Sequence, residues 1–421
     1  MEYIISLTSN KFSKDGSILG KVADFQHELQ KHEKEGLNIY KKSPVISSCD
    51  RRITISNRHT KQNVEAIHFG SNSYLGTSNL QNVIKESIAA TTLYGVGSGS
   101  VPLLTGTTLF QEELEKEISQ MSGCEETILF SSGYTANLGA ISGLLRPNHL
   151  IIHDKFNHAS LIDATILSGA KMIRYKHNDI EKLERILEEN HSLYPGGLMI
   201  ATDGVFSMDG DIADIPSILA LAKKYNALLL IDEAHATGVI GEKGAGTLSH
   251  FHITERDNIV LTGTLSKAIG TVGGYITSSK EIVDYLRVYA RSNMFSTSLP
   301  AHICAAAIEV LKYMKNTDIV ERLNRNFSYA RKRLSEEGFN ILNTETAIIP
   351  LIVGETSTTT QLANDFLKQG LIVNPIFPPA VPANLTRLRI SIMAIHDKED
   401  LDCLIQTAIK LFDKYGIKRS H

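Results

Sequence analysis

Short apolar runs alternate with amphipathic runs through the middle of the chain, and this alternation limits the fold more than any other feature. Runs such as TILF, HLIIHD, LMIATDG, ALLLIDE and NIVLTG are largely apolar, and segments between them, such as ASLIDATILSG and IPSILALAKKY, have helical spacing. Apolar strands separated by helices predict an α/β fold with a mostly parallel sheet covered on both faces. In such sheets, ligands bind beyond the carboxyl ends of the strands.

The length and the change of pattern along the chain predict three parts. A chain of 421 residues exceeds the size at which a single hydrophobic core stops growing. A charged helical pattern over 18–42 and a poorly periodic stretch to about 64 predict an N-terminal arm over 1–64. The alternating region predicts a large α/β domain over 65–298, and the long helices after it predict a smaller α+β domain over 299–421.

Composition excludes several classes of protein. With 43 basic and 46 acidic residues, the net charge of −3 leaves no excess positive field for a nucleic acid. No window approaches 18 uninterrupted apolar residues, and the N-terminus lacks the pattern of a signal peptide. We therefore expect a cytoplasmic protein without a transmembrane segment. The four cysteines are too few for a disulfide framework and too far apart for a metal site, so we expect no metal and reduced, buried thiols.

Ionisable side chains follow several of the predicted strands. Asp232 ends the run ALLLID, and His235 lies three residues later on the same exit loop. His158 follows HLIIHD, and Lys267 lies in LTGTLSKAIGTVGG, where glycines allow a ligand to approach the backbone closely. Taken singly, these residues are equally typical of a helix cap, a loop histidine or a solvated amine. Together, at one edge of a sheet, they favour a cofactor site.

Small residues at the same edge form a candidate anion site. A helix is predicted to begin directly after TILF, and its free amides and positive dipole end suit a phosphate. Pyridoxal phosphate (PLP) needs a lysine for its Schiff base, an acid to keep the pyridine nitrogen protonated and donors for its phosphate. The strand ends therefore predict a PLP site. Its candidate phosphate and hydroxyl donors are Ser132, Gly133, Tyr134, Ser207, Thr264 and Ser266.

The motifs identify a family resemblance. The chain resembles the fold-type I (aspartate aminotransferase-like) PLP enzymes and, among them, the α-oxoamine synthases. The resemblance runs from about residue 35 to the end, and the motifs that carry it are FGSNSYLG, LFSSGYTANLG, DKFNHASLIDA, TDGVFSMDGDIADIP, LLLIDEAHATGVIGEKGAG, TGTLSKAIGTVGGYI, MFSTSLP and LRISIMAIHD. So many motifs in one order make the signal specific.

The resemblance implies a role for each matching residue. Lys267 forms the Schiff base with the cofactor and shuttles the α-proton, Asp232 pairs with the pyridine nitrogen, and His235 pairs with the ring 3-oxygen. His158 stacks on the cofactor ring and Ser207 lies near the 3-oxygen.

The resemblance also implies a homodimer whose partner subunit completes the site. The phosphate is held by the Gly133 and Tyr134 backbone and the Thr264 and Ser266 hydroxyls. From FSTSLP, Ser296 and Thr297 reach the phosphate of the other subunit. The carboxylate of the amino acid substrate is received by Arg389, with Asn72 as a second contact.

The implied reaction is a decarboxylative condensation of an amino acid with an acyl thioester, which gives an α-amino ketone, CoA and carbon dioxide. FGSNSYLG, TDGVFSMDGDI and SIMAIHD most resemble bacterial serine palmitoyltransferases, which favours serine, a long acyl chain and sphingolipid biosynthesis. Formation of 8-amino-7-oxononanoate or 2-amino-3-ketobutyrate, or of a specialised metabolite, stays open, as does an acyl-carrier protein as donor. Related enzymes carry an arginine at Pro102 and a histidine at Phe110 or Gln111, so the thioester contacts depart from the family.

Other classes of protein fit less well. DEAH at 232–235 is typical of ATPases, but the chain lacks the phosphate-binding G-x-x-x-x-G-K-[ST] loop. GVGSGS lacks the G-x-G-x-x-G spacing of a nicotinamide site. A catalytically inactive scaffold with this fold would be expected to have lost Lys267 or Asp232, and both are present.

Overall fold

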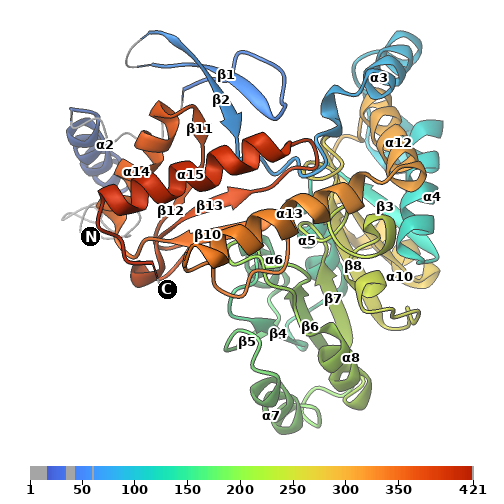
Figure 1. Cartoon of the computed structure of the whole chain (residues 1–421). Helices are drawn as coiled ribbons and strands as arrows, with labels where there is room; N and C mark the ends of the chain where they lie inside the picture. The colour runs from blue at the N-terminus through green and yellow to red at the C-terminus, as the bar shows by residue number, and fades with distance from the viewer. Residues whose placement is uncertain (1–16, 35–42, 59–60, 420–421) are drawn as a thin grey trace. The chain divides into compact units, whose positions relative to one another are not determined.

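The computed structural model describes residues 17–34, 43–58 and 61–419, and the chain divides into two compact units (Figure 1). The large unit comprises residues 72–325 and 345–347. The small unit comprises the described residues up to 71 together with 326–344 and 348–419.

A seven-stranded sheet in the order β3-β9-β8-β7-β6-β4-β5 forms the centre of the large unit (Figure 1). Strands β5, β4, β6, β7 and β8 pair in parallel, and β9 pairs antiparallel with both β8 and β3. The predicted mostly parallel sheet is therefore confirmed. The strands are β3 (Glu126–Phe130), β4 (Leu150–Asp154), β5 (Lys171–Tyr175), β6 (Leu198–Asp203), β7 (Leu228–Asp232), β8 (Ile259–Thr264) and β9 (Gly274–Ser278).

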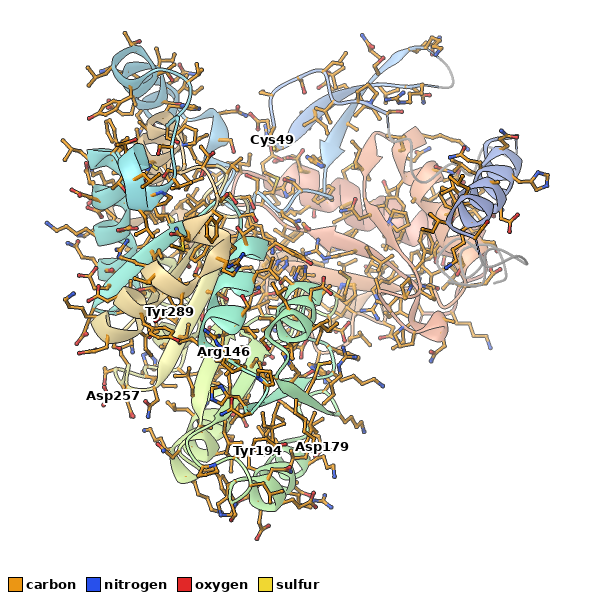
Figure 2. All side chains as sticks on the ribbon, turned by 180° about the vertical axis from the view of Figure 1, so that it is seen from behind. Cys49, Arg146, Asp179, Tyr194, Asp257 and Tyr289 are labelled. Carbon is orange, nitrogen blue, oxygen red and sulfur yellow. The ribbon has the colours of Figure 1, made fainter. Side chains whose placement is uncertain are left out.

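Helices cover both faces of this sheet because successive strand side chains point to opposite faces. On β7, Leu230 packs into an apolar cluster with α5, α6 and α10, whereas Leu229 and Ile231 pack into a second cluster with α7 and α8. Polar caps fix several helix starts; the Asp179 carboxylate, for example, accepts a 3.0 Å hydrogen bond from the Lys182 amide at the start of α7 (Figure 2). The covering helices are α5 (Gly133–Leu144), α6 (Ala159–Ser168), α7 (Ile180–Asn190), α8 (Ile215–Lys224) and α10 (Lys280–Tyr289).

The large unit contains further helices. Helix α12 packs against both α3 and α4 (Figure 1). These helices are α3 (Gln81–Tyr94), α4 (Leu109–Ser122), α9 (Thr247–His250), α11 (Arg291–Met294) and α12 (Ala301–Asn316), with short turns η1 (Thr77–Asn79), η2 (Pro102–Gly106) and η3 (Glu242–Gly244).

The small unit holds two three-stranded sheets, in the orders β1-β2-β11 and β10-β13-β12. Its strands are β1 (Arg52–Ser56), β2 (Asn63–His68), β10 (Ile348–Ile352), β11 (Leu371–Ile372), β12 (Asn374–Ile376) and β13 (Arg387–Ser391). Its helices are α2 (Ile18–Lys34), α14 (Thr356–Lys368), η4 (Ala383–Leu385), α15 (Lys398–Lys414) and most of α13 (Ile319–Glu336).

The N-terminal region contains more regular structure than the sequence indicated. The helical pattern predicted over 18–42 is observed as α2, and residues 35–42 lie outside the described part. The stretch predicted as poorly periodic contains β1 and the start of β2, which pair antiparallel, and Ile53 and Ile55 of β1 are buried. Only these two alternating side chains mark β1, which is too short a signal to stand out from a loop.

The compact units also differ from the predicted domain bounds of 64 and 298. Residues 65–71 belong to the small unit, because β2 pairs with β1 and β11. The second boundary lies after Arg325 within α13, because α12 packs on helices of the large unit.

Two remaining expectations concern the membrane and the cysteines. None of the helices in the described part of the chain combines the length and the apolar character that a bilayer crossing requires. Cys124 and Cys304 are buried as predicted, but Cys49 and Cys403 are exposed. Cys403 lies on the outer face of α15 and is not among the buried side chains of that helix.

Candidate active site

A cavity of about 240 Å³ lies at the carboxyl ends of the large sheet. Strands β4, β6, β7 and β8 end at this edge, and helices α5 and α6 begin there (Figure 1). The cavity is lined by Ser132, Gly133, Tyr134, Asn137, His158, Ser160, Asp203, Val205, Asp232, Ala234, His235, Thr264, Ser266 and Lys267. Nine of these were predicted from the sequence, so the structure brings most of the predicted site together.

Lys267 is held beside a histidine and a tyrosine. Its Nζ lies 2.9 Å from His235 Nε2, and the other ring nitrogen, Nδ1, lies 2.8 Å from the Tyr74 hydroxyl. Tyr74 is fully buried and His235 is buried. Because both nitrogens of His235 are engaged, the ring has a fixed orientation towards the amine.

The carboxylate of Asp232 is buried and held by two donors. Asn137 Nδ2 donates to Oδ2 at 2.7 Å, and the Ala234 amide donates to Oδ1 at 2.9 Å. A buried carboxylate needs such partners, since an unpaired one is strongly destabilising. Asp232 is therefore presented to the cavity in one orientation.

His158 caps α6 and joins the same network. Its Nδ1 lies 2.7 Å from Ser160 Oγ and accepts a 3.3 Å hydrogen bond from the Ser160 amide. Ser160 Oγ in turn accepts from Asn137 Nδ2 at 2.8 Å, which links His158 to Asp232. Burial and the nearby Lys267 lower the pKa of His158, against the opposing pull of Asp232. The ring is therefore uncharged near neutral pH, with its Nδ1 as the acceptor.

The start of helix α5 forms the anion-binding wall of the cavity. Ser132 caps the helix by accepting from the Thr135 amide at 3.1 Å, which leaves the amides of Gly133 and Tyr134 without partners within the helix. A Cβ atom on Gly133 would lie 2.9 Å from Thr264 Cβ, so only glycine allows this close approach. The Thr264 and Ser266 hydroxyls lie 2.8 Å apart beside it. Amides and hydroxyls converging on a helix N-terminus suit a phosphate.

Five predicted residues do not line this cavity. Val205, rather than Ser207, lines it from the loop after β6. Ser296 and Thr297 line a separate small cavity together with Pro102 and Gln111. Asn72 is exposed in the loop after β2, and Arg389 lies on β13 of the small unit, where it is buried and donates to Ser391 Oγ at 3.0 Å.

The positions that depart from the family pattern have a structural role in this chain. The Gln111 side chain is buried, and its Nε2 donates to the Gly106 and Leu299 carbonyl oxygens at 3.0 and 2.7 Å. Phe110 packs edge-on against Tyr94 with ring centroids 5.6 Å apart. Gln111 therefore connects the start of α4 to two loops.

The sequence analysis did not identify Asn137, Ser160, Asp203 or Tyr74. Asp203 is the last residue of β6, as Asp232 is of β7, so its strand-end position was a usable signal. Asn137 and Ser160 lie in the first turns of α5 and α6, four and one residues after the helix starts, where side chains face the strand ends. Tyr74 lies in FGSNSYLG, and no local pattern indicates that its hydroxyl reaches His235.

Known proteins resemble the chain over nearly its whole length. The family model "Aminotransferase class I and II" matches residues 64–407. The 8-amino-7-oxononanoate synthase of Thermoanaerobacter pseudethanolicus is 40% identical over 392 residues, which cover 93% of this chain and 96% of that protein.

Solved structures of serine palmitoyltransferase have the same fold. One, determined with its PLP internal aldimine, has a TM-score of 0.88 and 28% identity and covers 96% of this chain and 100% of that one. The serine palmitoyltransferase of Sphingomonas wittichii has a TM-score of 0.87 and 29% identity, with the same coverage.

Proposed function

Because the chain belongs to the aminotransferase class I and II family, and within it to the α-oxoamine synthases, we propose that it condenses a small amino acid with an acyl thioester and releases carbon dioxide. The chain is accordingly a PLP-dependent enzyme of the acyltransferase type. The observation that supports the proposal most directly is the one cavity shared by Lys267, His235 and Asp232.

The polar groups of the cavity fit PLP. An amine is available for the aldehyde at Lys267, a buried carboxylate for the ring nitrogen at Asp232, and the α5 amides with two hydroxyls for the phosphate. Asn137 Oδ1 is buried at this wall without a hydrogen-bond partner among the described residues, as expected where a bound group completes the site. Bound PLP supplies an electron sink that stabilises negative charge on the α-carbon of the amino acid.

Lys267 is the residue that we propose to tether the cofactor and to move the α-proton. Its Nζ reaches the cavity and lies 2.9 Å from His235 Nε2. With PLP and an amino acid bound, an uncharged Lys267 amine could serve as the base that accepts the α-proton. His235, fixed by Tyr74, orients this amine.

His158 supports ring binding because it is uncharged and held by Ser160. An uncharged flat ring stacks on an aromatic cofactor without placing a second positive charge beside Lys267. The roles implied for Ser207, Asn72 and Arg389 stay predictions.

The comparisons favour two of the candidate amino acids. Serine is favoured by the motifs shared with serine palmitoyltransferases and by the structural similarity to them. Alanine is favoured by the higher sequence identity to an 8-amino-7-oxononanoate synthase, since the amino-bearing end of that product has the carbon skeleton of decarboxylated alanine. The same two comparisons favour a long-chain acyl donor and a donor with a terminal carboxylate, respectively.

We also propose a homodimer. Several apolar side chains on α3, in the loop after it, on η2 and at the start of α4 are exposed, which is unusual for a monomer. Their exposed fractions are 61% for Ile88, 76% for Leu93, 80% for Val96, 76% for Leu104 and 71% for Leu109. A partner subunit on this face would bury them and would allow the predicted contribution of Ser296 and Thr297.

The proposal is tested by crossing alanine, serine and glycine with dicarboxylic and long-chain acyl thioesters, as CoA and acyl-carrier-protein forms, while thiol and carbon dioxide release are followed. One pair is expected to release both in equal amounts. Borohydride reduction should label Lys267, a Lys267→Ala variant should lose both labelling and turnover, and Lys280→Ala, which removes an exposed lysine, should lose neither. PLP-loaded protein that releases neither product with any pair would support the scaffold alternative instead.

A further inference from the structure

Two carboxyl groups lie side by side on one wall of the cavity. Asp203 ends β6 and Asp232 ends β7, and these strands pair in parallel with the two residues in register (Figure 1). Both side chains line the cavity, and their exposed fractions are only 3% and 5%. Two ionised carboxylates at paired positions of adjacent strands, in a buried site, repel each other, and this repulsion favours protonation of one of them.

The hydrogen bonds distinguish the two acids. Asp232 accepts from a side-chain amide at 2.7 Å and from a backbone amide at 2.9 Å, which stabilise its negative charge. The carboxyl of Asp203 accepts one longer bond, 3.2 Å, from the His158 amide to Oδ1. The remaining oxygen, Oδ2, is the one placed to carry a proton.

Burial and the charged groups around Asp203 together favour its protonated form. Burial, followed by the Asp232 charge, raises the pKa of Asp203 well above its ordinary value, and Asp154 on β4 adds to the rise. Lys267 and the His158 amide act in the opposite direction. Lys267 is the only lysine or arginine among the lining residues, and it faces two acids.

From this arrangement we propose that Asp203 is a neutral carboxylic acid in the resting protein, so that Asp232 is the single anion on this wall and Asp203 donates its O–H into the cavity. Asp203 is a positioning residue in two respects. It holds the loop that carries His158 through the amide of that residue, and it offers a donor to whatever acceptor fills the cavity. An ionised Asp203 would instead compete with Asp232 for the single positive charge of the bound cofactor ring.

Matched amide substitutions test this proposal. Asparagine mimics a neutral acid, since it keeps one acceptor and one donor, but it cannot replace an anion. We expect PLP binding to Asp203→Asn apoprotein to stay within about threefold of wild type, and Asp232→Asn to weaken it by about tenfold or more, because the latter loses an ionic interaction with the ring. Equal weakening in both variants would overturn the proposal, as would a larger loss in Asp203→Asn.

A second measurement does not depend on the cofactor. The infrared difference spectrum between wild-type apoprotein and Asp203→Asn at pH 7 should contain the carbonyl band of a protonated carboxylic acid, and the difference with Asp232→Asn should contain carboxylate bands. Carboxylate bands in the Asp203 difference would overturn the proposal. Should Asp203→Asn fail to fold, 13C NMR of aspartate-labelled wild-type apoprotein reports the same proton. The binding arm rests on the proposed function, whereas the spectroscopic arm holds even for a protein that does not bind PLP.

Discussion

Asn137 on α5 donates a 2.7 Å hydrogen bond to the Asp232 carboxylate at the end of β7 and, through the same nitrogen, a 2.8 Å bond to Ser160 Oγ. One amide therefore orients the acid proposed to hold the cofactor ring nitrogen and, through Ser160, the histidine proposed to stack on the ring. The amide lies nearly fully buried.

Replacing Asn137 by alanine should weaken PLP binding by about tenfold, since a hydrogen bond to a charged group contributes about 1.5–3 kcal/mol. Fluorescence titration of the apoprotein with PLP measures the effect. Asn190→Ala is the matched control, because Asn190 is also buried and donates to a carbonyl oxygen, that of Ile186, within α7. Equal losses of affinity in both variants would show that Asn137 has no specific effect on the site.

His177 connects the end of β4 to the loop after β6. Its Nδ1 lies 3.0 Å from Asp154 Oδ1 and its Nε2 lies 2.8 Å from Asp211 Oδ2, and the ring stacks on Phe156. Burial alone lowers the pKa of His177, but the hydrogen bonds to the two carboxylates outweigh it and raise the pKa from 6.5 to about 10. The folded protein therefore keeps a proton that the unfolded chain loses above pH 6.5.

This difference predicts the sign of a pH effect on stability. The contribution of His177 is complete below about pH 6.5 and is lost as the pH rises towards 10, by up to about 1.4 kcal/mol per pH unit. His177→Gln should be less stable than wild type at pH 6, and the gap should narrow by pH 9. Urea unfolding midpoints of the two apoproteins at both pH values measure the gap. A gap that does not change with pH would show that folding does not raise the pKa of His177.

Much of the site is encoded by local sequence, and some of it is not. Asp232, Lys267 and the start of α5 are readable because each follows an apolar strand, and parallel strands end at one edge. Tyr74 could not be read, because its bond to His235 joins residues 161 positions apart.

The same reasoning explains why the compact units differ from the predicted domain bounds. The helix α12 has the apolar pattern of any packed helix, and the sequence does not say that its partners are α3 and α4. Gln111 shows the converse case. Its departure from the family pattern was visible, but its bonds to the Gly106 and Leu299 carbonyls depend on the tertiary fold.

The proposed dimer face can be tested with a charge. Leu104→Glu places a carboxylate among the exposed apolar side chains of α3, the loop after it, η2 and the start of α4, where burial against a partner would be costly. We expect sedimentation to shift from dimer to monomer. Leu193→Glu is the control, because Leu193 is 70% exposed but lies beside Tyr194, at the end of the large unit that holds α7, away from α3 (Figures 1 and 2). A dimer that survives Leu104→Glu would exclude this face.

The close approach of α5 to β8 predicts a phosphate-specific defect. In Gly133→Ala the new methyl would lie 2.9 Å from Thr264 Cβ, so the helix start and the Thr264 side must shift relative to each other. Phosphate binding needs amides and hydroxyls to converge, so PLP affinity should fall by about tenfold, whereas pyridoxal, which lacks the phosphate, should bind as it does to wild type. Gly97→Ala, whose methyl meets nothing within 4 Å, should change neither affinity. Parallel titrations with PLP and pyridoxal distinguish the outcomes: an equal loss for both ligands would mean that the methyl disturbs the whole cavity and that α5 does not hold the phosphate.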